Sequence, residues 1–350
     1  GRSFAGASVA NYGVVDTGNV VYTKSPLSTN PYGIIKTNKG KSGIVSTLYA
    51  VYKPRENVNP EFVQIYFELN SRMNNYMQPL VNKGAKNDMK VTAENALKGG
   101  VCFPHLKEQN AIVDYFNSID HLITLHQRKC DETKNLKKYM LQKMFPQNGQ
   151  PVPEIRFSGF TEDWEQRKLS EVVKEIKRTD ETSNAPVMMI TAENGFINQS
   201  ERYSTNNAGQ SLKKYIILER GELAYNHGAS KLRPFGSCFS LTTEEKARIP
   251  FVYHCFSSET ENAEFLSIEL NGKAVESQLR RIVSSGARMD GLLNISFQEY
   301  TSIPILLPER SEQDKIASYF CQLDHLITLH QRECDELQNI KKYMLQNMFV

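Results

Sequence analysis

The nine residues DHLITLHQR occur twice in this chain, at positions 120–128 and 324–332. The 204-residue offset between the copies extends outward on both sides, from Pro104 and Pro308 to Phe145 and Phe349. About two thirds of these 42 aligned positions are identical. Similarity of this extent at a constant offset identifies an internal repeat, and the repeat organises the rest of the chain.

Each copy is predicted to form one long helix. Residues Ile112, Phe116, Ile119 and Ile123 recur at alternating spacings of four and three, which is the a/d pattern of a coiled coil, and the second copy continues it. No Pro or Gly interrupts residues 106–145. A helix of about 38 residues would be about 57 Å long at about 1.5 Å per residue.

The two helices are expected to pack against each other in antiparallel fashion, because globular regions join them at alternate ends. This arrangement would relate the two halves of the chain by a pseudo-two-fold axis. The middle of the first helix falls near residue 126, so His126 and His330 are predicted to lie side by side.

The regions outside the helices are predicted to be α+β domains. Short β-leaning runs there alternate with Gly, Asn, Ser and Pro, and helical stretches follow. A weaker repeat with an offset of 203 links these regions, since Tyr22 precedes Pro31-Tyr32-Gly33 as Tyr225 precedes Pro234-Phe235-Gly236. The expected order is a first globule at 1–103, a helix at 104–146, a linker at 147–159, a second globule at 160–307 and a helix at 308–350.

The repeat also predicts that the first globule is incomplete at its start. By the same offset, Gly1 aligns near Ser204, so the first globule lacks about 45 to 50 residues that the second globule has. The segment FSGFTEDWEQRKL at 157–169 opens the second globule and has no counterpart before Gly1.

Composition and charge narrow the class of protein. A chain of 350 residues with 40% hydrophobic and 23% charged residues is typical of a globular protein of about two domains. It has no apolar run long enough for a membrane span and no secretory signal, so we expect a cytoplasmic protein without membrane contact. The six cysteines show no metal-binding spacing, and the net charge of +3 is too small to indicate nucleic acid by itself.

Three further segments make the chain similar to the specificity subunit of type I restriction-modification enzymes. They are IRFSGFTEDWEQRKLSEV at 155–172, LPERSEQDKIASYF at 307–320 and FPHLKEQNAIVDYF at 103–116. The resemblance implies two target recognition domains that each read one half of a split DNA site, and helices that act as spacer and docking surface. The implied partners are double-stranded DNA, two methyltransferase (modification) subunits and restriction/motor subunits.

The sequence carries no motif for catalysis. Only Asn30-Pro31-Tyr32-Gly33 approaches the N-P-P-Y motif of adenine methyltransferases, and we interpret it as a turn. A phosphate-binding G-x-x-x-x-G-K-[ST] loop is absent from the sequence. His121 and His126 lie five residues apart, on different faces of a helix, so they do not form a metal pair. We therefore expect a non-catalytic subunit that needs no cofactor and no metal.

Candidate DNA contacts are clusters of cations with hydroxyl or amide side chains, the groups that bind phosphates and base edges. Ordinary solvated loops are the alternative interpretation of each cluster. In the first globule the candidates are Tyr22, Thr23, Lys24, Ser25, Lys36, Lys39, Lys41, Lys83, Lys86 and Asn87. In the second globule they are Lys213, Lys214, Tyr225, Asn226, His227, Lys231, Arg233, Arg280, Arg281 and Arg288.

The ends of the helices are predicted to bind partner subunits, because they carry more apolar surface than a two-helix seam can bury. These residues are Tyr139, Met140, Met144 and Phe145 in the first copy and Tyr343, Met344, Met348 and Phe349 in the second. An alternative function is a non-catalytic coiled-coil scaffold that joins two protein-binding globules.

Overall fold

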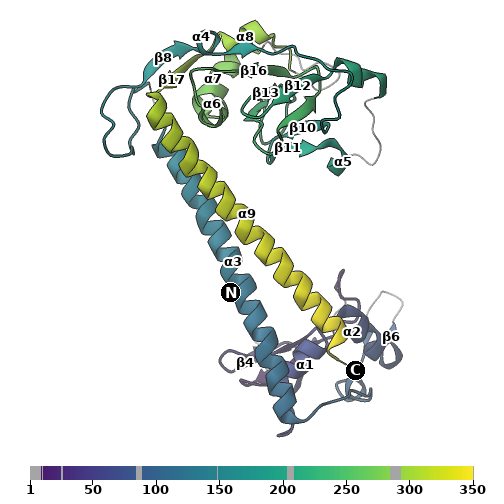
Figure 1. The fold of residues 1–350 in the computed structure, drawn as a ribbon. Helices are drawn as coiled ribbons and strands as arrows, with labels where there is room; N and C mark the ends of the chain where they lie inside the picture. Colours follow the sequence, from purple (N-terminus) through teal and green to yellow (C-terminus); the bar gives the residue numbers. More distant parts are fainter. Residues whose placement is uncertain are drawn as a thin grey trace. The chain divides into compact units, whose positions relative to one another are not determined.

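The computed structural model describes residue 9 and residues 11–24, 27–83, 89–147, 149–202, 209–283 and 293–349 (Figure 1). It divides into a first unit, made of Gly1–Asp131 and Ile327–Val350, and a second unit, made of Glu132–Leu326. Both copies of the sequence repeat form helices of 38 residues, α3 (Leu106–Lys143) and α9 (Arg310–Asn347). Each of these helices contributes residues to both units.

The globular part of the first unit contains small antiparallel sheets followed by short helices. Strand β2 is central in a three-stranded sheet of order β3-β2-β5, and β1 pairs separately with β4. The bounds are β1 Gly13–Val15, β2 Val20–Thr23, β3 Ile35–Thr37, β4 Gly43–Val45, β5 Tyr49–Tyr52, α1 Pro60–Tyr66, α2 Asn70–Met77, η2 Gln78–Leu80, β6 Asn82–Lys83, β7 Met89–Lys90 and η3 Asn95–Leu97.

The second unit repeats this plan and adds strands before it. Strands β12 to β16 pair as β1 to β5 do, and β9 extends the central sheet to the order β14-β13-β16-β9. The bounds are β8 Glu165–Lys168, α4 Leu169–Val172, β9 Lys174–Glu175, β10 Met188–Thr191, β11 Gly195–Asn198, α5 Gln199–Arg202, η4 Gly209–Lys214, β12 Ile216–Glu219, β13 Leu223–Asn226, β14 Ser237–Ser240, β15 Lys246–Ile249, β16 His254–Ser257, α6 Ala263–Leu270, α7 Lys273–Ile282, α8 Phe297–Thr301 and β17 Pro304–Leu307.

The α+β class predicted from the sequence is therefore confirmed, and the weak repeat between the globules corresponds to a shared strand pattern. In the second unit, the single tryptophan, Trp164, is only 2% exposed and packs in the hydrophobic core, as its apolar ring requires.

Within the first unit, α3 and α9 run antiparallel. The Nδ1 atoms of His126 and His330 are 3.3 Å apart, which confirms the predicted meeting of these two side chains. The Nζ atom of Lys341 lies 2.7 Å from a carboxylate oxygen of Asp120. Asp120 precedes His126 on α3, whereas Lys341 follows His330 on α9, so the two helices run in opposite directions.

The same helix contact recurs within the second unit. The Nζ atom of Lys137 lies 2.5 Å from a carboxylate oxygen of Asp324, and these residues are the repeat counterparts of Lys341 and Asp120. Phe145 of the first copy packs against Phe320 of the second, with ring centroids 6.1 Å apart. One helix sequence used twice thus supplies both halves of each contact.

A buried glutamine ties α9 to the globule of the second unit. Gln313 is fully buried, and its side-chain oxygen accepts a hydrogen bond from the backbone N–H of Asn262 at 2.9 Å. Its amide group donates to the carbonyl oxygen of Pro308 at 2.9 Å. Asn262 in turn caps the N-terminus of α6, where its side chain accepts from the backbone N–H of Phe265.

The first unit contains the same arrangement at the start of α3. Gln109 is 1% exposed, accepts from the backbone N–H of Asn59 at 2.9 Å and donates to the carbonyl oxygen of Pro104 at 2.9 Å. Asn59 caps α1 as Asn262 caps α6. In each unit, one buried amide therefore attaches the globule to the first turn of the helix that follows it.

We predict that Gln313→Leu destabilises the second unit by about 2 to 4 kcal/mol, because it leaves buried backbone groups without hydrogen-bond partners. Urea unfolding followed by fluorescence measures this change, since Trp164 is the only tryptophan and lies in the same unit. The matched control is Gln322→Leu on the exposed side of α9, which should change stability by less than about 0.5 kcal/mol. Equal effects of the two variants would contradict the role of Gln313.

Candidate nucleic-acid interface

The loop between β2 and β3 is closed by a buried tyrosine and a glycine. Tyr22 is 1% exposed, and its hydroxyl donates to the carbonyl oxygen of Tyr32 at 2.9 Å. Gly33 has a φ of +79°, and a Cβ atom there would lie 2.0 Å from the carbonyl oxygen of Thr23. Only glycine fits this position.

The loop between β13 and β14 is closed in the same way. The hydroxyl of Tyr225 donates to the carbonyl oxygen of Phe235 at 2.6 Å, and Gly236 has a φ of +82°. Burial raises the pKa of Tyr225 far above its ordinary value, so the hydroxyl remains a donor. The sequence Asn30-Pro31-Tyr32-Gly33 is part of the first of these turns, in agreement with its interpretation as a turn.

Four of the predicted DNA contacts have buried side chains. Tyr22 and Tyr225 close the two loops, and Thr23 is 9% exposed. His227 is 6% exposed, and its ring nitrogens lie 2.8 Å and 2.6 Å from the carbonyl oxygens of Leu293 and Val252. The side chains at these hairpin corners face the core and shape the loops.

In the first unit, Lys24 lies at the start of the closed loop, whereas the other candidate cations lie on β3 and after its far end. Lys36 on the edge strand β3 and Lys41 before β4 are exposed, and Lys24 after β2 is half-buried. The Nζ atom of Lys39 lies 2.6 Å from a carboxylate oxygen of Glu61 on α1, which partly neutralises its charge. Three other candidates, Ser25, Lys86 and Asn87, and the side chain of Lys83 lie outside the described residues.

In the second unit, helix α7 brings Arg280 beside the closed loop. The guanidinium of Arg280 lies over the ring of Phe235, 5.4 Å from its centroid, and also pairs with Glu276 at 3.5 Å. Arg281 is exposed, and so is Lys231 within the loop. This cluster joins cations from two elements that are far apart in the sequence, and it forms the best candidate interface in the second unit.

The remaining candidates of the second unit are less available to a ligand. Asn226 is half-buried and donates to the carbonyl oxygen of Ile190 at 3.0 Å. Arg233 donates to the carbonyl oxygen of Asn271 at 2.7 Å, and burial lowers its pKa. Lys213 pairs with Glu181 at 3.1 Å and Lys214 is exposed, whereas Arg288 lies outside the described residues.

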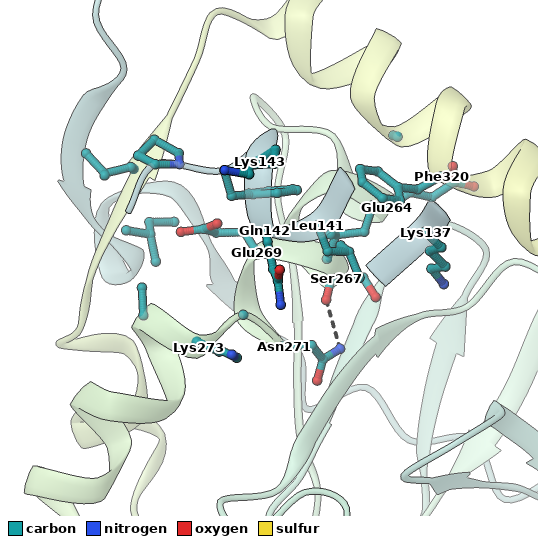
Figure 2. A pocket seen from close by; sticks show the side chains of 18 of the residues that line it. Lys137, Leu141, Gln142, Lys143, Glu264, Ser267, Glu269, Asn271, Lys273 and Phe320 are labelled. Atoms are coloured by element: carbon teal, nitrogen blue, oxygen red, sulfur yellow. Dashed lines mark hydrogen bonds between the residues drawn. The ribbon is translucent and has the colours of Figure 1, made fainter. Parts of the chain in front are cut away.

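The end of α3 and helices α6, α7 and α9 surround a cavity of about 920 Å³ in the second unit (Figure 2). Glu269 of α6 lies in its wall and is 8% exposed. Burial raises the pKa of this carboxyl to about 7, although the backbone N–H of Leu306 opposes the shift. No ion pair with Glu269 is formed by the described cations.

Two of the predicted partner-binding side chains are buried in the core of the second unit. Met144 and Phe145 are 2% and 7% exposed, and Phe145 packs against Trp164 and Phe265 with ring centroids 5.8 Å away in each case. The globule covers the end of α3, so these two side chains are core residues.

The other predicted partner-binding residues remain at least partly accessible. Tyr139 and Tyr343 are 48% and 63% exposed. Met140, Met344, Met348 and Phe349 are half-buried.

A second apolar face of the long helices was not predicted. Leu122 and Leu136 on α3 are 40% and 44% exposed, and their repeat counterparts Leu326 and Ile340 on α9 are 41% and 46% exposed. All four lie outside the a/d seam, and each unit exposes one from each helix, Leu122 and Ile340 in the first and Leu136 and Leu326 in the second. Conserved spacing in both copies was the signal that could have identified them.

No group of three or more His, Cys, Asp or Glu side chains in the described ranges is placed to hold a metal ion. The helices within these ranges include none long and apolar enough to cross a membrane.

Comparison with known proteins identifies the fold. No family model matches the chain. The type I restriction-modification system S subunit from M. genitalium is similar, with a TM-score of 0.57 and 11% identity over 97% of this chain and 84% of that one. The HsdS subunit from Thermoanaerobacter tengcongensis has a TM-score of 0.46 and 17% identity over 96% of this chain and 81% of that one. The predicted likeness to type I S subunits is confirmed at the level of the fold.

We predict that Glu269→Gln stabilises the second unit at neutral and alkaline pH. The folded-state pKa of about 7 lies above the ordinary value of 4.5, so the stability of the wild type falls as pH rises from 4.5 to 7. The variant keeps the acceptor but lacks the charge, and should gain about 3 kcal/mol at pH 8 and nothing near pH 4. Urea unfolding at both pH values checks this, and a gain that does not depend on pH would contradict it.

Proposed function

We propose that this chain is the DNA-specificity subunit of a type I restriction-modification complex. The observation that supports the proposal best is the duplication. Each globule has a loop that a buried tyrosine and a glycine close in the same way, and the fold is similar to that of an S subunit. A protein that reads two unlike DNA sequences can use the same domain fold twice with different residues in the loops. Each unit contains the same pattern of paired strands with its own loop residues.

Each unit is proposed to read one half of a bipartite target. We propose that Lys24 and Lys36 in the first unit, and Lys231 with Arg280 and Arg281 in the second, bind DNA phosphates near the loops. Lys41 is proposed to bind phosphate from the opposite end of the β2–β3 hairpin. We assign target recognition domains to 1–103 and 160–307, and spacer helices to 104–146 and 308–350. A helix of about 57 Å exceeds one B-DNA turn of about 34 to 36 Å and is shorter than two, so the half-site centres lie at a separation between one and two turns.

The partners proposed for the chain are two methyltransferase subunits and the restriction/motor subunits. The first unit exposes Leu122 and Ile340, the second exposes their counterparts Leu326 and Leu136, and Tyr139 and Tyr343 are also exposed. Two equal surfaces are suited to two equal partners. Catalysis is assigned to those partners because the sequence has no complete methyltransferase or nucleotide-binding motif.

We predict that binding to duplex DNA weakens steeply with salt, and that the double variant Arg280→Gln/Arg281→Gln reduces the slope. Each lost phosphate contact should lower the slope of log affinity against log salt by about 0.9. Fluorescence anisotropy with a DNA duplex, at several salt concentrations, measures both quantities.

The matched control is Lys174→Gln, which removes an exposed cation that pairs with Glu259 away from the loop. Its slope should equal that of the wild type. Affinity without salt dependence, or an equal loss in the control, would favour the scaffold alternative.

A further inference from the structure

In the first unit, an arginine on α2 fills the space between α1 and the end of α9. The guanidinium of Arg72 donates hydrogen bonds to the carbonyl oxygens of Tyr66 and Leu345, both at 2.7 Å. It also lies over the rings of Tyr66 and Phe349, 4.8 Å and 4.5 Å from their centroids. One cationic side chain therefore connects α2 with both neighbouring helices in this unit.

The second unit has no arginine at the corresponding position. The two buried residues of α2 and those of α7 are four positions apart in both helices, so Met73 of α2 corresponds to Val275 of α7. The residue before each of them is Arg72 in the first unit and Ala274 in the second. A methyl group can neither fill the space of a guanidinium nor donate its hydrogen bonds.

The cavity of about 920 Å³ in the second unit lies at this same place (Figure 2). The counterparts of Leu345 and Phe349 at the 204-residue offset line it. So does the residue seven positions after the capping asparagine of α6, where the first unit has Tyr66. These lining residues are Leu141, Phe145 and Glu269, together with Ala274. The second unit thus leaves open the space that Arg72 fills in the first.

Glu269 makes the wall of this cavity a site for a cation. Its side chain is 8% exposed, and no cation among the described residues pairs with it. Burial raises the pKa of the carboxyl to about 7, so most copies are ionised at pH 8. Leu141 lies in the last turn of α3, where backbone carbonyl groups lack partners within the helix. A carboxylate and carbonyl oxygens together suit the several N–H donors of a guanidinium.

The lysines that line the cavity do not neutralise this carboxyl. Lys137 pairs with Asp324, and Lys143 pairs with Glu154. The volume lies in the upper part of the range of about 300 to 1,000 Å³ that is typical of small-molecule sites. Apolar side chains such as Phe320 also line the cavity, so it has room for an alkyl chain attached to the cation.

We propose that this cavity binds an alkyl-guanidinium group, carried by free arginine or by an arginine side chain of a peptide. The guanidinium pairs with Glu269 in the space that Arg72 occupies in the first unit, and the alkyl chain packs on the apolar lining. Binding compensates the buried negative charge, which supplies the reason for affinity. The inference does not rest on DNA recognition, and its test contains no DNA.

A titration of the full chain at pH 8, followed by the NMR signals of the ligand, tests the proposal. We expect L-arginine to saturate one site per chain, and citrulline, which has a similar shape without the charge, to bind at least tenfold more weakly. Glu269→Gln should weaken arginine binding at least tenfold. This variant should remain folded, because it removes a buried charge and keeps an acceptor.

The matched control is Glu264→Gln, which removes another negative charge from the lining on the same helix and should change the affinity less than twofold. Equal affinity for arginine and citrulline, or an unchanged affinity in Glu269→Gln, would overturn the proposal.

A second variant, Ala274→Arg, introduces the arginine of the first unit into the cavity. It should weaken arginine binding at least tenfold, because the new side chain takes the place of the ligand, and an unchanged affinity would overturn the proposal. A capped Ala-Arg-Ala tripeptide distinguishes the two sources. Binding of the tripeptide alone supports an arginine on a polypeptide, binding of free arginine supports a small molecule, and binding of neither would overturn the proposal.

Discussion

The hydrogen bonds of two buried amides, Gln109 and Gln313, determine how each globule is attached to a long helix. Each accepts from the backbone of an asparagine that caps a globule helix, and each donates to a carbonyl just before its own helix. Removing such an amide leaves its buried partners without hydrogen bonds, so these amides stabilise the attachment. Any loop carried by a globule is positioned through this joint, and the candidate DNA interface depends on it.

Other contacts are also repeated in the two units. The pairs Lys137–Asp324 and Lys341–Asp120 repeat one helix contact in the two units, and the pairs Tyr22–Tyr32 and Tyr225–Phe235 repeat one loop closure. The side chains that form these contacts are the same in both copies, whereas cations around the loops differ. Repeated structural contacts with different loop cations suit a protein in which the same fold presents two different DNA-binding surfaces.

The sequence predicted the helices and the meeting of His126 and His330, because helix periodicity is local and the repeat relates the two copies directly. It did not predict that Tyr22, Tyr225 and His227 face the core, since the direction of a side chain at a hairpin corner depends on packing with distant residues. Long-range packing also buried Met144 and Phe145. The structural role of the two glutamines was missed, although asparagine and glutamine recur at a spacing of 50 residues in one half, Asn59 and Gln109, and 51 in the other, Asn262 and Gln313.

The central claim is that the two units read separate halves of one DNA target. Its most direct test is to exchange residues 160–303 for the corresponding globule of another S subunit and to sequence the methylated sites in cells that carry the exchanged chain and its methyltransferase. The account predicts that one half-site changes while the other half-site and the gap between them stay the same. A change in both half-sites together, or no change at all, would contradict it.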